Sequence, residues 1–364
     1  MIKILLIINI FLISLLLNAD VKDISEQELK KQIGRMLLVG FDNEKIDKNS
    51  KIVKLIQKYD LGGVILFDKF YENRSKTKNI SSPAQVKDLT SKLKEYANKP
   101  LLISVDFEGG KVSRLKKIYG FDKFPSAKKI SELSSKDSVN IYNSMSLMLY
   151  KNGFNCDFAP VVDLAIEPKN MVIYGLERSY GKNPEQVARY AKIFMDSLKK
   201  AKVLSVLKHF PGHGSSLADS HKGFVDITDT WSEKELEPYQ ILIDSGDVKM
   251  IMTAHVYNKH LDDKYPATLS YKINTKLLRQ KMNYQGVIIS DDLQMNAIRN
   301  HYTLKETVTL AINSGVDILL FGNQLANQNI DELVDIIYKQ VQNEEIKYSR
   351  ILESNKRINN VLRY

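Results

Sequence analysis

Cysteine is almost absent from this sequence, because Cys156 is the only one among 364 residues. A single thiol permits no intramolecular disulfide, so the folded chain must depend on its hydrophobic core for stability. Cysteine–histidine catalysis would also have to use this one thiol. It lies inside an apolar segment, where buried structural cysteines are common. The composition therefore excludes a disulfide-stapled fold and argues against thiol chemistry.

Features of nucleic-acid-binding proteins are also missing. The chain carries 53 Lys and Arg against 43 Asp and Glu, a formal net charge of +10, but its lysines are spread in small groups. We find no recognition helix, zinc-finger spacing or RNA-binding aromatic motif. The surplus charge therefore indicates a solvated basic surface that weakly favours approach to an anionic polymer, and we expect no nucleic-acid partner.

Only one long apolar run is present. It covers residues 4–17 and is shorter than the ~20 residues that a membrane span needs. Lys3 precedes the run and a small residue, Ala19, follows it, so residues 1–19 are typical of a signal peptide. An uncleaved anchor is the alternative, and the only one that would give membrane association. Asp20 follows rather than a cysteine, which argues against a lipoprotein, and we expect a periplasmic or secreted protein.

No low-complexity linker divides residues 20–364, so we expect one domain after the signal. Within it, a short apolar run repeatedly precedes an amphipathic stretch, and such continuous runs are typical of parallel strands buried on both faces. The runs are 36–41, 63–68, 101–106, 156–163, 203–209, 250–255, 287–291 and 317–321. Eight strand–helix units predict an α/β fold, a (β/α)8 TIM-type barrel. An open doubly wound sheet is the alternative, but no Gly-x-Gly-x-x-Gly turn follows the first run.

Several helices have recognisable starts. Ser82 and Asn183 are each followed by a proline, which suits the first helical position, and then by a possible capping partner. Ser232, before Glu233 and Glu235, has a similar pattern. The charged tail after about Asn329 predicts one or two closing helices.

Most of the apolar runs end in a polar residue. The side chains at these ends are Asp106, Asp163, Lys208, His209, His255 and Asp291. Barrel enzymes place their chemistry at the carboxyl ends of the strands. A purely structural core would not need so many polar groups there, so the pattern predicts a pocket that binds a polar ligand through many hydrogen bonds.

Residues 208–221, KHFPGHGSSLADSH, hold three of the six histidines. Four side chains here could supply zinc ligands: His209, His213, Asp219 and His221. However, Pro211 and Gly212 break any helix that would align the histidines, and no Glu neighbours them as a general base. A zinc site and a structural loop stay open as alternatives. We favour a dyad in which Asp219 orients the His221 imidazole and leaves its other nitrogen for proton transfer.

The run 287–291 delivers the carboxylate of Asp291 into the barrel mouth. Asp292 comes one residue later and should point elsewhere, as a cap for the following helix. Strand-end aspartates are common, but together with the dyad Asp291 supplies the second catalytic group that glycoside cleavage needs.

Two further segments carry candidate binding residues. Two glycines follow Asp106 closely and allow a tight turn, after which Asp106 and Arg114 can meet sugar hydroxyls. The alternative is a strand-end turn with a surface arginine. Arg178 precedes a capped helix, and standing alone it would be interpreted as part of a surface ion pair.

These segments resemble the glycoside hydrolase family 3 β-N-acetylglucosaminidases, the NagZ-like β-N-acetylhexosaminidases of bacteria. The resemblance covers most of the chain after residue 19. It includes the strings IGRM at 33–36, GGVILF at 62–67, FAP at 158–160, MTAH at 252–255, PATLS at 266–270 and GVD at 315–317. The string at 208–221 is highly specific, because family relatives outside this branch use a Glu acid on an additional domain.

The resemblance implies a retaining, exo-acting β-N-acetylhexosaminidase that needs no metal or organic cofactor. It implies Asp291 as the nucleophile, His221 as the general acid/base and Asp219 as the partner of His221. The implied N-acetylglucosamine-binding residues are Asp106, Arg114, Arg178, Lys208 and His209. The expected substrates are oligosaccharides or muropeptides that contain N-acetylglucosamine, and we expect a monomer.

The sequence also departs from the family pattern. Phe107 replaces the usual Gln, Lys111 the usual Arg, and Ser215 and Ser216 an Asp-Thr pair, while a polar insertion occupies residues 71–79. These departures concern the preference for the leaving group rather than the chemistry. Two alternatives stay open: phosphorolysis, because a neutral imidazole does not repel an anionic acceptor, and a non-catalytic sugar-binding protein of the cell envelope.

Overall fold

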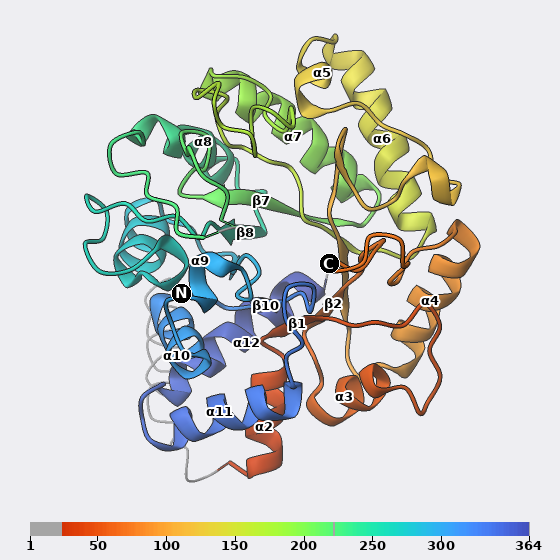
Figure 1. Ribbon diagram of the computed structural model, residues 1–364, viewed down its shortest axis with the longest axis vertical. Helices are drawn as coiled ribbons and strands as arrows, with labels where there is room; N and C mark the ends of the chain where they lie inside the picture. Colours follow the sequence, from red (N-terminus) through yellow and green to blue (C-terminus); the bar gives the residue numbers. More distant parts are fainter. Residues whose placement is uncertain (1–23, 221–222, 364) are drawn as a thin grey trace, which may run out of the picture.

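The computed structural model describes residues 24–220 and 223–363, and these form a barrel of short parallel strands inside a ring of helices (Figure 1). The strands are β1 (Leu37–Gly40), β2 (Gly63–Ile65), β3 (Leu102–Val105), β6 (Cys156–Asp157), β7 (Leu204–Phe210), β8 (Met250–Thr253), β9 (Val287–Ile289) and β10 (Leu319–Phe321). Their order in the sheet is β10-β1-β2-β3-β6-β7-β8-β9. A parallel bridge between Ile289 and Ile318 links the two ends of the sheet. The predicted (β/α)8 TIM-type barrel is confirmed.

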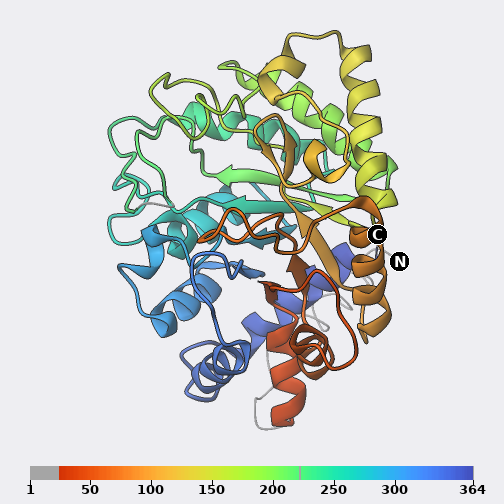
Figure 2. The same cartoon turned by 45° about the vertical axis from the view of Figure 1, so that its right-hand side comes forward.

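The helices cover the outside of the barrel (Figure 2). The α-helices are α2 (Glu26–Gly34), α3 (Lys51–Tyr59), α4 (Pro83–Tyr96), α5 (Ala127–Ser131), α6 (Ser135–Lys151), α7 (Pro184–Lys200), α8 (Glu237–Asp244), α9 (Asn296–Arg299), α10 (Leu304–Ser314), α11 (Ile330–Gln342) and α12 (Tyr348–Leu362). Shorter or irregular elements are the 3-10 helices η2 (Lys117–Tyr119), η3 (Glu233–Leu236) and η4 (Ala267–Leu269), the π-helix η5 (Lys272–Lys281), and a hairpin of β4 (Phe107–Gly109) and β5 (Val112–Ser113).

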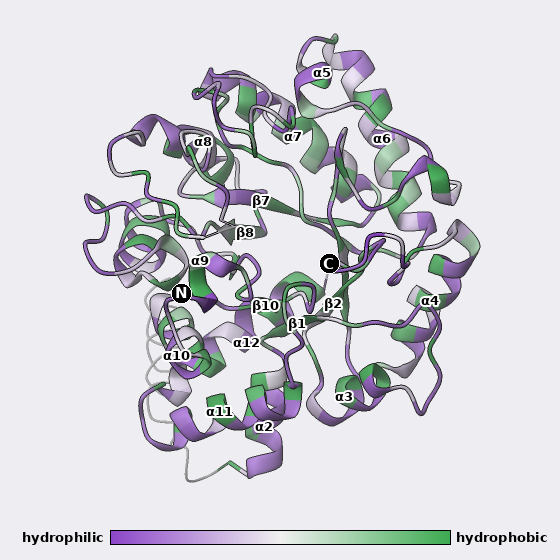
Figure 3. Ribbon diagram, in the orientation of Figure 1, coloured by the Kyte–Doolittle hydropathy of each residue, from purple (hydrophilic) through white to green (hydrophobic). Residues whose placement is uncertain are grey.

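The core has the two-sided burial that a barrel requires. Every residue of β1, β2, β3, β8, β9 and β10 is buried, because each strand faces the barrel interior on one side and the helices on the other. The helices are mixed in polarity, with hydrophilic residues on much of their outer surface (Figure 3). This pattern explains why the strands have continuous apolar runs and the helices have amphipathic ones.

Two of the predicted helix starts are confirmed. The Ser82 hydroxyl accepts a hydrogen bond from the Gln85 N–H at the start of α4, and the Asn183 side chain accepts one from the Gln186 N–H at the start of α7. A proline occupies the first turn of both helices. The predicted closing helices are α11, which Asn329 caps, and α12.

The prediction of an α-helix starting at Ser232 is wrong in its geometry. A 3-10 turn, η3, comes first, and α8 begins only at Glu237. Pro238 has no N–H and its ring would clash with the carbonyl of Lys234, so an α-helix cannot run through this position from Glu233.

The run 156–163 was also predicted too long as a strand. Only β6 pairs continuously, and Pro160, which has no N–H, interrupts the regular ladder. The chain nevertheless stays beside β7, because the Val162 N–H donates to the Lys208 carbonyl at 2.9 Å. Asp163 therefore still reaches the carboxyl end of the barrel. Within the described part of the chain, no helix has the length and apolar character for crossing a bilayer.

Candidate active site

A cavity of about 850 Å³ is lined by residues at the carboxyl ends of the strands, where barrel enzymes place their chemistry. Seven of the eight predicted site residues line it: Asp106, Arg114, Arg178, Lys208, His209, Asp219 and Asp291. The eighth, His221, lies outside the described residues. The structure thus brings the described candidates together in one cavity, while the role of each stays a prediction.

Four charged side chains form a paired group at the cavity: Lys208 and Glu108 are buried, Asp106 and Arg178 are partly buried, and all but Glu108 line the cavity. The Lys208 ammonium group lies 3.0 Å from Asp106 Oδ1 and 2.7 Å from Glu108 Oε1. Arg178 donates two hydrogen bonds to Glu108, from Nε at 2.8 Å and from Nη2 at 2.7 Å. Two cations therefore balance two carboxylates. We call Asp106, Glu108, Arg178 and Lys208 the charged cluster.

The protonation states of the charged cluster follow from its burial and its pairing. Burial by itself would raise the pKa of the Asp106 carboxyl, but the charges of Lys208 and Arg114 outweigh it and hold the pKa well below its ordinary value. Burial opposes the charged form of Glu108 too, and Arg178 and Lys208 lower its pKa nevertheless. All four groups are therefore charged at neutral pH, a fixed set of donors and acceptors suited to sugar hydroxyls.

Glu108 is the functional candidate that the sequence analysis missed. Its side chain is only 5% exposed, and it bridges two predicted binding residues that are 70 and 100 positions away. Its position between Asp106 and the glycine pair was the only local signal. Arg178, only 10% exposed, is consequently not part of a surface ion pair.

The glycine pair has the role that the sequence predicted. Gly109 and Gly110 have φ angles of 86° and 58°, in the left-handed region. A Cβ atom on Gly109 would lie 2.3 Å from the Pro125 carbonyl oxygen. The tight β4–β5 turn returns the chain so that Arg114 Nη2 lies 3.4 Å from Asp106 Oδ2, and both side chains line the cavity.

His209 is fixed by hydrogen bonds on both ring nitrogens. Nδ1 lies 2.7 Å from Asp163 Oδ2, and Nε2 lies 3.3 Å from Arg178 Nη2. Burial, followed by the nearby Arg178 and Lys208 charges, lowers the pKa of His209 well below its ordinary value. A neutral ring that donates from Nδ1 to Asp163 and accepts at Nε2 from Arg178 fits this geometry.

The loop after β7 is held from two sides. The Asn170 amide donates to the carbonyls of His213 and Gly214, at 2.8 and 3.1 Å. Glu235, in η3, also contacts this loop, because its Oε2 accepts a hydrogen bond from the Gly214 N–H at 2.9 Å. His213 Nδ1 lies 2.6 Å from the Ser216 hydroxyl. These contacts set the direction in which the chain leaves toward Asp219.

The zinc alternative gains no support from the described geometry. Among residues 24–220 and 223–363, no three His, Cys, Asp or Glu side chains form a group that could hold a metal ion. The Nε2 atom of His209 faces a guanidinium group, which would repel a cation. His221, one of the four ligands considered, is outside these ranges.

Asp291 and Asp292 have different surroundings although both line the cavity. The Asp292 N–H donates to Asp291 Oδ1 at 2.8 Å. Asp292 Oδ1 accepts from the backbone N–H groups of Gln294 and Gly322, at 3.0 and 3.2 Å. Asp292 thus stabilises the turn after β9. The expectation that it points elsewhere and caps the next helix was wrong, because Asp292 also lines the cavity and α9 begins only after Met295, which gives no side-chain cap.

His255 ends the sixth predicted run but has a structural position. It is 1% exposed, with Nδ1 2.8 Å from the Thr268 hydroxyl and Nε2 2.9 Å from the Asp292 carbonyl. It lies beneath the turn that carries Asp291 and Asp292 and does not line the cavity.

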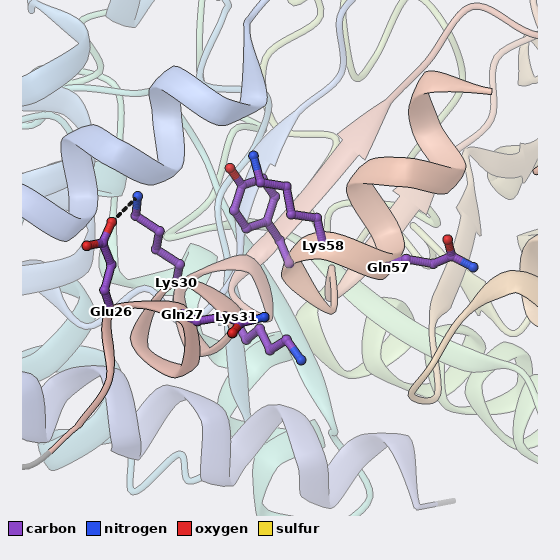
Figure 4. A pocket seen from close by; sticks show the side chains of 7 residues that line it. Glu26, Gln27, Lys30, Lys31, Gln57 and Lys58 are labelled. Atoms are coloured by element: carbon purple, nitrogen blue, oxygen red, sulfur yellow. Dashed lines mark ion pairs between the residues drawn. The ribbon is translucent and has the colours of Figure 1, made fainter. Parts of the chain in front are cut away.

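A second cavity, of about 450 Å³, lies away from these residues, between α2 and the end of α3 (Figure 4). Its lining residues are Glu26, Gln27, Lys30, Lys31, Gln57, Lys58 and Tyr59. Lys30 forms an ion pair with Glu26 at 2.7 Å. This second cavity contains none of the predicted site residues, so the cavity at the strand ends is the candidate active site.

Comparisons with known proteins bear on the family of this chain. The family profile "Glycosyl hydrolase family 3 N terminal domain" matches residues 28–361. A Beta-hexosaminidase of Tolumonas auensis is 36% identical over 273 residues, which cover 73% of this chain and 77% of that protein. The chain spans only 48% of a related protein, Beta-hexosaminidase A of Pseudoalteromonas piscicida.

Solved structures show the same relationship. A glycoside hydrolase family 3 β-N-acetylglucosaminidase from Paenibacillus is 31% identical, with a TM-score of 0.82 over 92% of this chain and 62% of that one. Zinc-bound CbsA from Thermotoga neapolitana is 26% identical, with a TM-score of 0.78 over 92% of this chain and 68% of that one.

Proposed function

The chain belongs to glycosyl hydrolase family 3, and from this premise we propose that it is a retaining, exo-acting β-N-acetylhexosaminidase. Its substrates are chains that end in β-linked N-acetylglucosamine. The observation that carries the proposal is the position of Asp291 in the same cavity as the charged cluster. A carboxylate in the same cavity as a dense set of fixed donors and acceptors suits attack on a sugar that is held by its hydroxyls.

The proposed reaction has two steps. In the first, an Asp291 oxygen bonds to C1 of the sugar, the C1–O bond to the leaving group breaks, and His221 gives its proton to the departing oxygen. In the second, His221 takes a proton from water, the water oxygen bonds to C1, and the Asp291 carboxylate is released. Asp219 orients His221 in both steps. The roles of His221 and Asp219 rest on the family resemblance.

The charged cluster contributes specificity in this proposal. Its groups are buried or partly buried and already paired, so they are preorganised before the sugar binds. A sugar that lacks the matching hydroxyl would leave one of their remaining donor or acceptor positions unsatisfied in a largely desolvated site, which costs far more than losing an apolar contact. The cluster therefore favours one sugar in the deep part of the cavity.

A panel of chromogenic β-glycosides tests the function. We expect 4-nitrophenyl β-N-acetylglucosaminide to be cleaved far faster than the glucoside, galactoside and xyloside. Release of N-acetylglucosamine, with or without phosphate in the buffer, supports hydrolysis. Release of the sugar 1-phosphate would support phosphorolysis instead, and no turnover on any substrate would leave a sugar-binding protein.

The finer assignments are peptidoglycan fragments as natural substrates, a cleaved signal and a periplasmic or secreted location. They are supported by the composition of residues 1–19 and by the basic net charge, which favours anionic envelope polymers. N-terminal sequencing of protein from fractionated cells should find a mature chain that starts near Asp20. An intact Met1 on cytoplasmic protein would refute the location. Sedimentation should give the mass of a monomer.

A further inference from the structure

Most of the polar insertion at 71–79 lies in a well-anchored hairpin, residues 69–78, beside the cavity. Lys69 and Thr77 form an antiparallel bridge, and the Phe70 N–H donates to the Lys76 carbonyl at 3.2 Å. At its base, the buried Lys78 ammonium group donates to the Asn323 carbonyl. These contacts hold the hairpin in one position relative to the barrel.

The side of the hairpin nearest the cavity is fixed as well. The Tyr71 N–H donates to Gln324 Oε1 at 2.9 Å, and Gln324 Nε2 donates back to the Lys69 carbonyl at 3.2 Å. Gln324 belongs to the loop after β10, at the carboxyl end of the barrel. The hairpin and this loop together form a rim that lines the cavity.

Arg74 and Tyr71 stand on this rim as a pair. The Arg74 guanidinium lies 5.0 Å from the centre of the Tyr71 ring, and both residues are exposed and line the cavity. In the described part of the chain, Arg74 has no carboxylate within 4.0 Å. By contrast, Arg114, Arg178 and Lys208 are each paired with one. The rim therefore offers a cation whose charge the protein does not neutralise.

The depth of the lining residues indicates that Arg74 and Tyr71 contact a different part of the substrate from the charged cluster. Exposed side-chain fractions rise from 3% at Lys208 to 18% at Asp106 and 28% at Arg114, and Tyr71 is 44% exposed. An exo-acting enzyme holds one terminal sugar at the deep end. Whatever reaches the rim then belongs to the leaving group.

We propose that Arg74 and Tyr71 select leaving groups that carry a carboxylate, with Arg74 pairing with the carboxylate and Tyr71 packing against the adjacent sugar ring. This inference rests on the proposed exo-acting function. Arg74 is a specificity-determining residue under it, not a catalytic one. The carboxylate can come from an acidic substituent on the second sugar or from a peptide attached to that substituent.

The test compares leaving groups that differ in charge. The substrates are N-acetylglucosaminyl disaccharides whose second sugar is N-acetylmuramic acid, its methyl ester, its L-alanine amide with a free terminal carboxylate, or uncharged N-acetylglucosamine. The quantity measured is the ratio of kcat/KM for each acid to kcat/KM for the neutral substrates. It is determined for the unchanged protein, for Arg74→Gln and Arg74→Lys, and for Lys76→Gln as the matched control.

Lys76 is a suitable control because it is on the same hairpin, carries the same charge and does not line the cavity. We expect Arg74→Gln to lower the ratio about fivefold, the upper range for an exposed ion pair, and Arg74→Lys to keep most of it. Lys76→Gln should leave the ratio unchanged. The Arg74 effect should vanish as salt rises from about 0.01 to about 1 M, where the Debye length falls from about 30 to about 3 Å.

The two acids identify the source of the carboxylate. A loss confined to the free acid assigns Arg74 to the sugar substituent, and a loss confined to the alanine amide assigns it to the peptide. Equal ratios in the unchanged protein and Arg74→Gln, or an equal fall in Lys76→Gln, would overturn the inference. Cleavage of the 4-nitrophenyl glycoside by the unchanged protein tests the proposed function separately, so the two failures are distinguishable.

Discussion

Replacing Glu108 by Gln removes one negative charge from the charged cluster while keeping the size of the side chain. Glu108 accepts two hydrogen bonds from Arg178 and lies 2.7 Å from the Lys208 ammonium group. An amide has one acceptor oxygen and no charge. Asp106 would then be the only carboxylate left in the charged cluster, and Arg178 would lose its paired carboxylate.

Burial sets the size of the expected effect. The three side chains concerned, Glu108, Arg178 and Lys208, are only 3–10% exposed. Exposed ion pairs contribute about 0–1 kcal/mol, but breaking a buried pair by removing one partner costs about 3–5 kcal/mol, because the other charge stays buried without compensation. We expect Glu108→Gln to lose stability in that larger range. We also expect a fall in kcat/KM of about 100-fold, since both cations would move.

Urea unfolding and steady-state kinetics measure these two losses. A double-mutant cycle with Lys208→Met isolates the interaction, because the double variant removes one charge of each sign. Its loss of stability should be smaller than the sum of the two single losses. Glu108→Gln with a stability loss below about 1 kcal/mol, together with strict additivity in the cycle, would refute the electrostatic account of the cluster.

Three further predictions follow from the site. His221→Ala should slow glycosylation far more on disaccharides than on 4-nitrophenyl glycosides, because nitrophenolate leaves without a proton. Pre-steady-state glycosylation rates on both substrates measure this difference. Equal losses on both would mean that His221 is not the acid. Activity should survive extensive EDTA or phenanthroline treatment, and a loss that zinc restores would revive the metal alternative. Burial raises the pKa of Glu235 to about 7. The Glu235 carboxyl of the folded protein therefore keeps a proton that the unfolded chain releases near pH 4.5. The free energy of unfolding should consequently fall as pH rises between these two values. Glu235→Gln should remove this fall, on the order of 3 kcal/mol, in urea unfolding at pH 5 and pH 8; an unchanged pH dependence would contradict the assignment.

Features set by neighbouring residues could be predicted from the sequence. The eight apolar runs mark the barrel strands because each strand is buried on both faces, and Ser82 and Asn183 mark helix starts because a cap needs only local contacts. The carboxyl ends of parallel strands necessarily meet, which places Asp106 and Asp291 in one cavity.

Features set by contacts between distant segments could not. Glu108 has no periodicity or motif that would show its bond to Arg178, which is 70 residues away. The rim position of Arg74 depends on the contact of its hairpin with Gln324, more than 250 residues further along the chain. The strand predicted at 156–163 and the α-helix predicted from Ser232 were wrong for a common reason. Pro160 and Pro238 each lack the N–H that the predicted element required.

Trapping the covalent intermediate tests the central claim most directly. A 5-fluoro N-acetylglucosaminyl donor with a good leaving group should form the glycosyl-enzyme quickly and hydrolyse slowly, so that the labelled peptide can be sequenced by mass spectrometry. The account predicts one sugar per chain, attached to Asp291, and no label on Asp291→Ala. A label on Asp292 or another residue, or turnover that releases the inverted anomer without a covalent adduct, would contradict it.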